Sequence, residues 1–397
     1  MMKTKKKHEK EIKEIQKKIR RKTKEKTNSK IVLGRSKGKS HITREDKYKE
    51  EHNKIDISKL DKIISIDIKE KTIIVEPRVT MEKIVRFTKY YNLIPKVIPE
   101  FKGITVGGAI QGSGIESSSF KYGLFDRSVI EMECVLGNGD CVNASPYINS
   151  DLFYSISGSH GSFAILTLVK LELVDYYPYV KIRYSKFDTI DHGISALKKV
   201  CNDSSVDYVD AIVFGELTCS TKYFWNKWFF QHIIQKTTQK WSNYHYKNNN
   251  IFFNDIYSDI MRTEDYLFRY DRCAFWAGII VNWNSFLFRF LFGWFHSSTN
   301  LFRMRKIWKI EDMEKKGICQ DYLIPISNSK IFIEKVIQKV YIFPIWICPT
   351  KAIKYKDIDN KMIPYSTFTL TEPNYLMKEN PKQEFNSNSN SNSNSDF

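Results

Sequence analysis

Hydrophobic and polar positions follow two different periods along the first part of the chain. Between residues 8 and 26, charged residues separate Ile12, Ile15 and Ile19, which is the spacing of an amphipathic helix. Short runs rich in Ile and Val are typical of strands. These runs occupy residues 31–35, 63–68 and 71–76. The pattern therefore predicts helices and strands that are mixed from the start.

This mixed pattern continues as far as residue 174. Thr80 precedes a helix that reaches about Tyr91, and a threonine in that place caps a helix N-terminus. The stripe of this helix is Met81, Ile84, Val85 and Thr88. Further predictions are a strand at 129–136, a tight turn at Asn138–Gly139, a return strand from Cys141, a helix capped by Asn149 that reaches Ile156, and a strand at 165–174. The predicted fold class is α+β.

A change of composition near residue 179 divides the chain. Glycine becomes rare there and aromatic residues crowd together, as in 223–230, so we place a domain boundary near 175–180. From Asn386 to Ser395 the chain repeats Asn and Ser, a composition that cannot bury enough apolar surface to fold. The expected units are a basic arm at 1–30, two domains at 31–178 and 179–350, and a tail at 351–397.

The positive charge is concentrated at the N-terminus. The 397 residues carry a formal net charge of +18, and the first 49 carry +14 of it, so the basic character belongs to the arm and not to the folded body. A lysine-rich arm can meet nucleic acid or an anionic membrane surface, or it can be a solvated extension. Seven cysteines without a CxxC pair argue against a disulfide scaffold and a zinc module, so no metal is expected.

Targeting and membrane-spanning segments are not expected from the sequence. The lysine-rich start has no apolar core behind it, which argues against a signal peptide. No run of 18 apolar residues predicts a transmembrane helix. The nearest candidate, 286–295, has ten residues. It is either a buried helix or a segment that dips into a membrane interface, where Phe and Trp are frequent.

Five glycines within twelve residues mark the segment with the clearest chemistry. They are Gly103, Gly107, Gly108, Gly112 and Gly114. Glycine lets a backbone approach a ligand closely and adopt positive φ, so its N–H groups can hold a diphosphate. The GxGxxG spacing of a Rossmann fold fails, and no P-loop motif is present. A diphosphate loop and a turn-rich packing corner both stay open from these residues alone.

The same segment resembles the flavin segment of the Δ24-sterol reductase (24-dehydrocholesterol reductase, Diminuto-like) family. From residue 104 to 125 it reads Ile-Thr-Val-Gly-Gly-Ala-Ile-Gln-Gly-Ser-Gly-Ile-Glu-Ser-Ser-Ser-Phe-Lys-Tyr-Gly-Leu-Phe. Further segments match in the family's order, at 75–81, 149–154, 265–276 and 345–349. The resemblance covers about 31–350. It implies a two-lobed FAD-binding domain of the PCMH or vanillyl-alcohol-oxidase type at 31–178, followed by an α+β cap, or substrate, domain at 179–350.

The resemblance also implies non-covalent FAD and the residues that hold it. These residues are Thr105, Val106, Gly107, Gly108, Gly112, Ser113, Gly114, Glu116, Ser117, Ser118, Gly158 and Gly161. The segment 34–43 matches the family's first diphosphate loop loosely, and 158–163 would pass near the adenine–ribose half of the cofactor. His41 raises the alternative of a covalent flavin, but relatives of the reductase show no histidine with that role.

The implied reaction is reduction of a C=C bond in a sterol-like lipid, with NADPH as electron donor. One carbon needs a hydride and the other a proton. The catalytic residues are unknown, and the weak candidates for the proton donor are Tyr122, Tyr270, Asp271 and Arg272. The expected location is the cytoplasmic side of the endoplasmic reticulum membrane, with peripheral contact to an anionic membrane surface and no nucleic-acid partner.

Three functions stay open at this point. Members of the family continue well beyond their Trp-Ile-Cys-Pro motif, here Trp346 to Pro349, whereas this chain runs into the Asn-Ser repeat. Because this later segment is expected to be missing, the sequence alone does not decide whether the chain is catalytically active. The chain is therefore an FAD-dependent reductase, a flavin-fold protein without catalysis that acts as a binding or membrane-associated module, or an FAD oxidase of a small alcohol or lactone.

Overall fold

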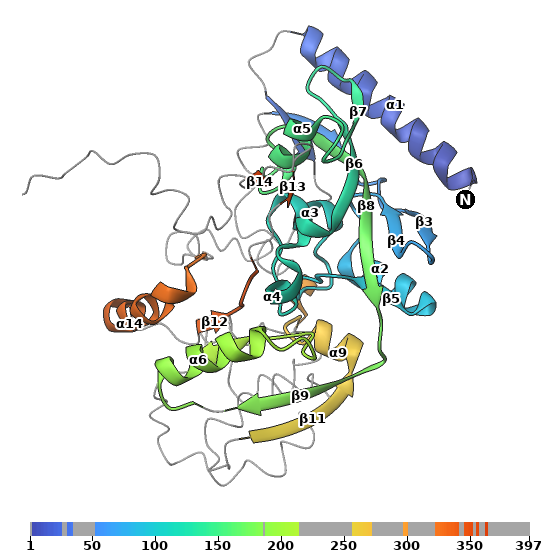
Figure 1. Cartoon of the computed structure of the whole chain (residues 1–397). Coiled ribbons are helices and arrows are strands. Elements are labelled where there is room, and N and C mark those ends of the chain that lie inside the picture. Colours follow the sequence, from blue (N-terminus) through green and yellow to red (C-terminus); the bar gives the residue numbers. More distant parts are fainter. Residues whose placement is uncertain are drawn as a thin grey trace, which may run out of the picture.

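The computed structural model describes ten stretches of the chain. They are residues 2–25, 30–34, 52–185, 187–213, 256–271, 297–300, 322–340, 345–351, 355–356 and 362–363. The predictions for 35–51, 223–230, 286–295 and the Asn-Ser repeat lie outside these residues. Figure 1 shows an upper group of elements around one sheet and a lower group below it. We call the described residues up to Asp175 the first region and those from Tyr179 to Lys351 the second region.

The first region is built on a six-stranded antiparallel sheet. Its strands are β3 (Ile63–Asp67), β4 (Thr72–Val75), β5 (Leu93–Pro95), β6 (Val129–Val135), β7 (Cys141–Ala144) and β8 (Ile165–Asp175). β8 lies between β4 and β6, β3 and β7 are outside them, and β5 pairs with the end of β8. The turn between β6 and β7 contains Gly139 at φ +85°, a conformation that glycine adopts freely. The predicted strands of this sheet and the hairpin are confirmed.

Two short helices of the first region begin differently from each other. α2 (Met81–Thr88) is capped as predicted, since the Thr80 side chain accepts a hydrogen bond from the Lys83 N–H, and the predicted stripe is buried. A single turn, η2 (Lys89–Tyr91), extends it. α5 (Ser150–Ile156) forms with Asn149 at its N-cap position, as predicted, but the Asn149 side chain makes no capping hydrogen bond. Asn149 is left-handed with φ 49°, and its amide donates to the Asn143 carbonyl instead.

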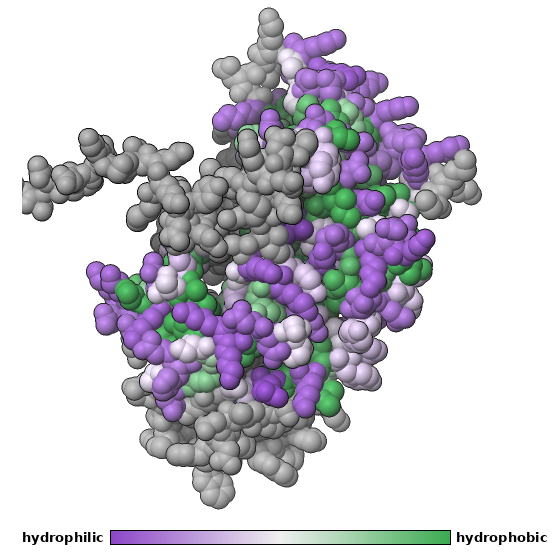
Figure 2. All heavy atoms as spheres, viewed as in Figure 1, coloured by the Kyte–Doolittle hydropathy of each residue, from purple (hydrophilic) through white to green (hydrophobic). Residues whose placement is uncertain are grey.

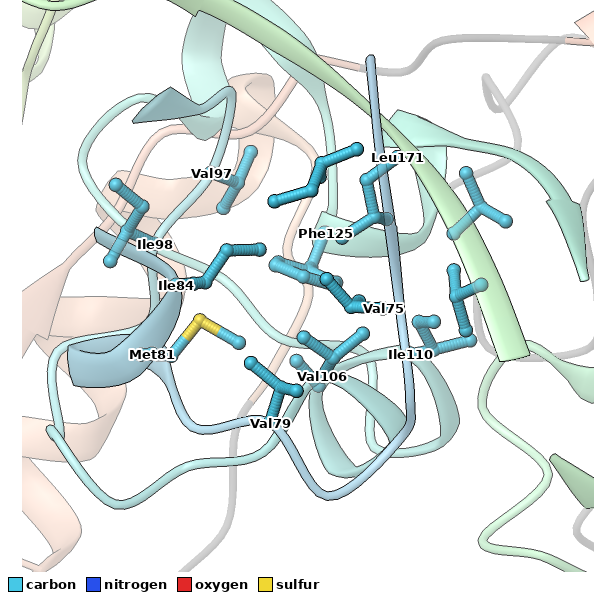
Figure 3. Packing of buried hydrophobic residues seen from close by; sticks show 14 of the residues in the cluster. Val75, Val79, Met81, Ile84, Val97, Ile98, Val106, Ile110, Phe125 and Leu171 are labelled. Atoms are coloured by element: carbon cyan, nitrogen blue, oxygen red, sulfur yellow. The ribbon is translucent and has the colours of Figure 1, made fainter. Parts of the chain in front are cut away.

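The core of the first region joins the sheet to α2 and to α3 (Val106–Gln111). Figure 3 shows Val75 and Leu171 from the sheet together with Met81, Val106 and Phe125, all pointing into one apolar interior. Each of these side chains is fully buried. Burying a side chain of this size stabilises a fold by about 1.5–3 kcal/mol. The helix that carries the glycine-rich segment is therefore anchored in the main core.

The N-terminal helix α1 (Met2–Lys24) also packs on the first region. Its predicted stripe of isoleucines is buried in a second, smaller cluster. The cluster consists of Ile12, Ile15, Ile19, Ile55, Ile57, Leu60, Val135 and Ile165. Two short parallel strands border it, β1 (Ile31–Gly34) and β2 (Asn53–Asp56), of which β2 was not predicted. Figure 1 shows α1 beside the β6 and β7 end of the sheet.

The interpretation of residues 1–30 as an arm apart from the folded body is wrong for α1. Besides its apolar stripe, the helix has polar contacts with the hairpin between β6 and β7. Gln16 donates to the Gly139 carbonyl at 2.9 Å, and Arg20 is 3.1 Å from Asp140. The lysines point away from the sheet, and Figure 2 shows hydrophilic side chains over the outer surface of this part of the molecule. α1 is thus a docked helix with a basic outer face.

The second region follows β8 after a short connection between Asp175 and Tyr179, within the interval where the sequence changes. Two antiparallel pairs organise it: β9 (Tyr179–Ser185) with β11 (Ile256–Arg262), and β10 (Ala211–Val213) with β12 (Ile345–Ile347). Its helices are α6 (Ile190–Cys201), α9 (Thr263–Leu267), the turn η5 (Ile326–Asn328) and α14 (Ser329–Val340). A small pair, β13 (Tyr355–Lys356) and β14 (Met362–Ile363), follows. Strands and helices in both regions confirm the α+β class.

Within the part of the chain that the structure describes, no helix combines the length and the apolar character needed to cross a bilayer.

Candidate functional site

The first part of the glycine-rich segment forms a helix, and the residues that follow it form the predicted loop. Residues Val106–Gln111 make α3, and the side chain of Thr105 caps it by accepting a hydrogen bond from the Gly108 N–H at 3.2 Å. Glycine is a poor helix former. The cap and the buried side chains of Val106 and Ile110 stabilise this short helix in place of intrinsic propensity.

The glycines serve close packing, which corrects the expectation of positive φ. A Cβ atom at Gly107 would lie 2.7 Å from the Pro77 Cβ, and one at Gly112 would lie 2.9 Å from the Gly108 carbonyl oxygen. Gly112 has φ −110°, whereas the positive φ falls on Ser113, at 54°. A side chain at these glycines would therefore clash with the protein itself before it met a ligand.

Several N–H groups of this segment already donate within the protein. The N–H of Val106 donates to Val79, that of Gly107 to Pro77, and that of Gly114 to Ala109, at 2.7–2.9 Å. The N–H groups of Gly108 and Gly112 are also used inside α3. These five N–H groups therefore already have acceptors within the protein, and their assignment to a diphosphate stays a prediction.

The segments that the sequence assigned to the flavin converge in the structure. The Gly158 N–H donates to the Ile110 carbonyl at 3.3 Å, and the His160 N–H donates to the Gln111 carbonyl at 3.0 Å. Gly161 has φ +82°, and a Cβ there would be 3.4 Å from Leu33 of β1 and 3.5 Å from the Gln111 Oε1. The end of β1, the end of α3 and the turn at 158–161 thus meet at one place.

Gln111 is the residue at this meeting point that the sequence did not single out. Its side chain is 9% exposed, and among the described residues its Nε2 has no hydrogen-bond acceptor. A buried donor without a partner costs about 1–3 kcal/mol, so such groups are rare unless a ligand or water completes them. The amide therefore fits a ligand that offers an oxygen acceptor. A lone glutamine has no sequence pattern that reveals it.

The serine-rich continuation, residues 116–119, is buried and bonded within the protein. The Ser117 N–H donates to the Glu116 carboxylate at 2.9 Å, and the Ser118 hydroxyl donates to the Lys96 carbonyl at 2.8 Å. Ser119 begins α4 (Ser119–Tyr122), and its hydroxyl accepts from the Glu116 N–H. η3 (Phe125–Ser128) follows. The predicted site residues Glu116, Ser117 and Ser118 therefore hold the segment in place rather than line an open surface.

An arginine from the second region contacts this continuation. The guanidinium Nη2 of Arg269 lies 2.5 Å from Glu116 Oε1 and 2.9 Å from Asp210 Oδ2. The hydroxyl of Tyr270 and the indole N–H of Trp346 donate to the same Asp210 oxygen, at 2.7 and 3.2 Å. We call these five side chains the Arg269 cluster. Arg269 is completely buried, and it is the largest buried charged side chain in the described part of the chain.

Burial shifts the ionisation of the Arg269 cluster. Desolvation raises the pKa of Glu116, although the nearby guanidinium acts in the opposite direction. For Arg269, desolvation opposes the charged form, but Glu116, Tyr266 and Asp210 outweigh it and raise the pKa. Burial and the Asp210 carboxylate also raise the pKa of Tyr270 far above its usual value. The guanidinium is therefore permanently charged and the Tyr270 phenol permanently neutral at physiological pH.

Three of the four candidates for a proton donor lie among the described residues. Tyr270 donates its hydroxyl to Asp210, and Asp271 accepts from the Lys102 N–H at 3.0 Å and the Ser298 hydroxyl at 2.7 Å. Tyr122 at the end of α4 is half-buried, and burial raises its pKa. Arg272 lies outside the described residues. Only Tyr122 combines partial exposure with a phenol that stays protonated at neutral pH.

Among the described residues, no group of three or more His, Cys, Asp or Glu side chains is arranged so that it could hold a metal ion.

Comparison with known proteins bears on the same segments. Residues 7–145 match a family model described as an FAD binding domain. The match includes α1, the sheet strands up to β7, and the whole glycine- and serine-rich segment. It therefore treats the N-terminal helix as part of the domain, in agreement with its docking in the structure.

Similar curated proteins come from animals and plants. A Delta(24)-sterol reductase of Macaca fascicularis is 27% identical over 365 residues, which are 86% of this chain and 67% of that protein. A Delta(24)-sterol reductase homolog of Caenorhabditis elegans is 26% identical over 381 residues, 86% of this chain and 69% of that protein. A Delta(24)-sterol reductase of Pisum sativum is 29% identical over 345 residues, 76% of this chain and 57% of that protein.

Proposed function

We propose that this chain, which matches an FAD binding domain and is similar to Delta(24)-sterol reductases, is an FAD-dependent oxidoreductase that reduces a C=C bond of a sterol-like lipid with NADPH. The observation that carries the proposal is the meeting of the end of β1, the end of α3 and the turn at 158–161 around the unpartnered amide of Gln111. These segments lie far apart in the sequence. Their convergence is what one extended cofactor requires.

Non-covalent FAD fits the residues at this place. The Gln111 Nε2 would donate to an oxygen of the cofactor, which would give an acceptor to a buried donor that has none among the described residues. Gly158 and Gly161, with φ +67° and +82°, let the turn approach the ligand without a side chain. Attachment through His41 is not part of the proposal, and that residue lies outside the described part of the chain.

When bound, FAD supplies the hydride transfer between NADPH and the double bond. The chain has to supply the proton for the second carbon, and Tyr122 is the candidate that the structure favours. Its phenol stays protonated because burial raises its pKa, and Lys121 counters this shift only in part. Tyr270 bonds to Asp210 within the second region, and Asp271 accepts from the Lys102 N–H of the first region, so both side chains are already engaged. The second region would be the cap that covers the lipid.

The first experiment tests whether the cofactor is bound and then whether the reaction takes place. The purified protein should show the visible absorption of oxidised flavin, and acid precipitation should release the flavin into the supernatant. Anaerobic NADPH should bleach the flavin, and a sterol with a double bond at carbon 24 should restore its absorption and yield the saturated product by mass spectrometry. A flavin that remains in the pellet would contradict non-covalent binding.

The other outcomes separate the alternative functions. Flavin that binds but is neither reduced by NADPH nor reoxidised by a sterol would favour a binding module without catalysis. Flavin that is reduced by a small alcohol or lactone and reoxidised by oxygen would favour an oxidase. Absence of any flavin from a folded protein would refute the proposal at its base.

The Gln111 amide provides a sharper test, because its two roles have opposite signs. Gln111→Met removes a buried donor without a partner, so the folded protein should be as stable as wild type or more stable. Its affinity for FAD should fall about five- to tenfold, the equivalent of one hydrogen bond. The control is Gln16→Met, which removes an amide that already donates to Gly139. This control should lose stability and keep its affinity for FAD.

Contact with an anionic membrane is a further part of the proposal, on the cytoplasmic side of the endoplasmic reticulum. The isoleucine stripe of α1 is buried, so only its basic face is offered to a membrane and insertion is not expected. Lys10, Lys13 and Lys17 are exposed on this face, and each basic residue near an anionic surface contributes about 1 kcal/mol. Changing the three to Glu should weaken binding to anionic vesicles, more strongly at low salt. Unchanged binding would refute the contact.

A further inference from the structure

Residues 116–119 are held by three separate segments of the second region. The Val209 N–H donates to the Ser117 carbonyl at 2.8 Å, and the Lys351 N–H donates to the Ser119 carbonyl at 2.9 Å. The third segment provides Arg269, whose guanidinium contacts Glu116. The serine-rich continuation of the proposed flavin segment is therefore fixed from outside the domain that contains it.

The guanidinium of Arg269 has little freedom to move. Its carbon lies 4.2 Å from the centre of the Tyr266 ring and 4.6 Å from that of Tyr270, so two aromatic faces set its orientation. Tyr270 and Trp346 both donate to Asp210, which fixes the second carboxylate. Glu116 is therefore held at a position defined by the second region.

The position of Glu116 bears directly on the backbone near the proposed flavin. Ser113 has φ 54°, a left-handed conformation that is unfavourable for a residue with a side chain and persists only where its surroundings enforce it. On its N-terminal side, α3 is anchored in the core. On its C-terminal side, the nearest charged anchor is Glu116. Without Glu116, the nearest anchor on this side would be the backbone of Gly114, whose N–H donates to Ala109 and whose carbonyl accepts from Phe125.

We propose that Arg269 is a positioning residue for the flavin segment, and that it sets the conformation of residues 112–116 by holding Glu116 against Asp210. The proposal rests on the function proposed above. It assigns to the second region a role in cofactor binding that is separate from covering the substrate. A buried ion cluster is weak evidence for stability and is better suited to select one arrangement among several.

The test compares variants that leave different buried charges in the Arg269 cluster. Arg269→Met leaves two carboxylates unpaired, so a second variant combines it with Glu116→Gln and Asp210→Asn, which leaves no charge behind. Each protein is stripped of flavin and titrated with FAD, and its visible spectrum and melting temperature are recorded. Both variants should bind FAD about tenfold more weakly or worse and show an altered flavin spectrum. Arg269→Lys, which keeps one cation, should restore part of the affinity.

The matched control is Lys89→Met. Lys89 and Glu264 also form an ion pair between the first and second regions, and both are partly buried. This variant should keep the affinity for FAD and the flavin spectrum of the wild type.

Each outcome decides between the two proposals. Wild-type affinity and spectrum in a folded, charge-balanced variant would overturn the role of Arg269 and leave the proposed function intact. Loss of folding in both the charge-balanced variant and Arg269→Lys would also overturn it, because the cluster would then be structural. A wild-type protein that binds no FAD would instead refute the proposed function, and the positioning role with it.

Discussion

Two places in the molecule bury one cation between two carboxylates. At the sheet, His8 of α1 lies 2.8 Å from Glu76 and 3.1 Å from Glu133. At the junction with the second region, Arg269 lies between Glu116 and Asp210. His8 of α1 meets two carboxylates of the sheet region, whereas Arg269 meets Glu116 of the first region and Asp210 of its own, second region. Both places therefore join parts of the fold that packing alone would not orient.

The two places differ in what surrounds the cation. Next to His8, the isoleucine stripe of α1 supplies apolar contacts with the sheet. Arg269 instead has aromatic rings on its guanidinium and hydrogen bonds from Tyr270 and Trp346 to its second carboxylate. The helix α1 would still have its apolar contacts without His8. The neighbours of Arg269 also pack in the main core, but Arg269 itself is completely buried. Loss of the cation should therefore cost more at the second place.

The two cations also differ in how they respond to pH. Burial alone would lower the pKa of His8, but its hydrogen bonds to Glu133 and Glu76 outweigh burial and raise the pKa to about 9. Arg269 stays charged at any pH at which the protein folds. Only the attachment of α1 should therefore weaken in mildly alkaline solution.

The largest effect is expected for Arg269→Met. Removing one partner of a buried charge group leaves the carboxylates of Glu116 and Asp210 without compensation, at a cost of about 3–5 kcal/mol. The loss should be measured as the change in unfolding free energy from denaturant titration. A loss below about 1 kcal/mol would show that water or a proton already compensates these carboxylates.

The next effect tests the apolar part of the α1 junction. Ile15 is 3% exposed, and Ile15→Ala should cost about 2–4 kcal/mol because a cavity would remain between α1 and the sheet. Ile68→Ala is the matched control, since Ile68 is 54% exposed and its loss should change the unfolding free energy little. Equal effects of the two substitutions would contradict the docking of α1. Deletion of α1 is a poorer test, because it would expose Ile55, Val135 and Ile165 to water.

The sequence predicts the local elements of the first region better than its contacts. The period of β8 and the stripe of α2 are local patterns, and both elements form as predicted. The stripe of α1 predicts a helix, but its partners Val135 and Ile165 are distant in the sequence and have no pattern that points to α1. Strand β2 was missed because Ile55 is the only apolar residue among its four.

The candidate site was predictable in outline only. The resemblance indicated the segments that converge at Gln111, but the helix α3 was missed because adjacent glycines disfavour one. Packing of Gly107 against Pro77 and the cap from Thr105 override that propensity. The Arg269 cluster brings together residues from separate parts of the chain, and no spacing in the sequence connects them.

The pH dependence of His8 separates the two junctions. With a pKa of 6.5 unfolded and about 9 folded, protonated His8 contributes stability that is fully present below pH 6.5 and is lost as the pH rises through 9. His8→Gln should cost about 2 kcal/mol near pH 6 and much less above pH 9. Cys141, which also faces Glu133, has a pKa of about 11 and stays neutral in this window. If the loss of stability caused by His8→Gln were the same at both pH values, the raised pKa assigned to His8 would be contradicted.

The smallest effect is expected from the exposed charges of the α1 junction. Arg20 and Asp140 are 3.1 Å apart, but both are more than half exposed, so water and salt weaken their attraction. Arg20→Met keeps the aliphatic stem that packs on the hairpin turn at Gly139 and removes only the charge. The unfolding free energy should fall by no more than about 0.5 kcal/mol, and less at high salt. A loss as large as that of His8→Gln would mean that surface charge, and not burial between two carboxylates, holds α1 on the sheet.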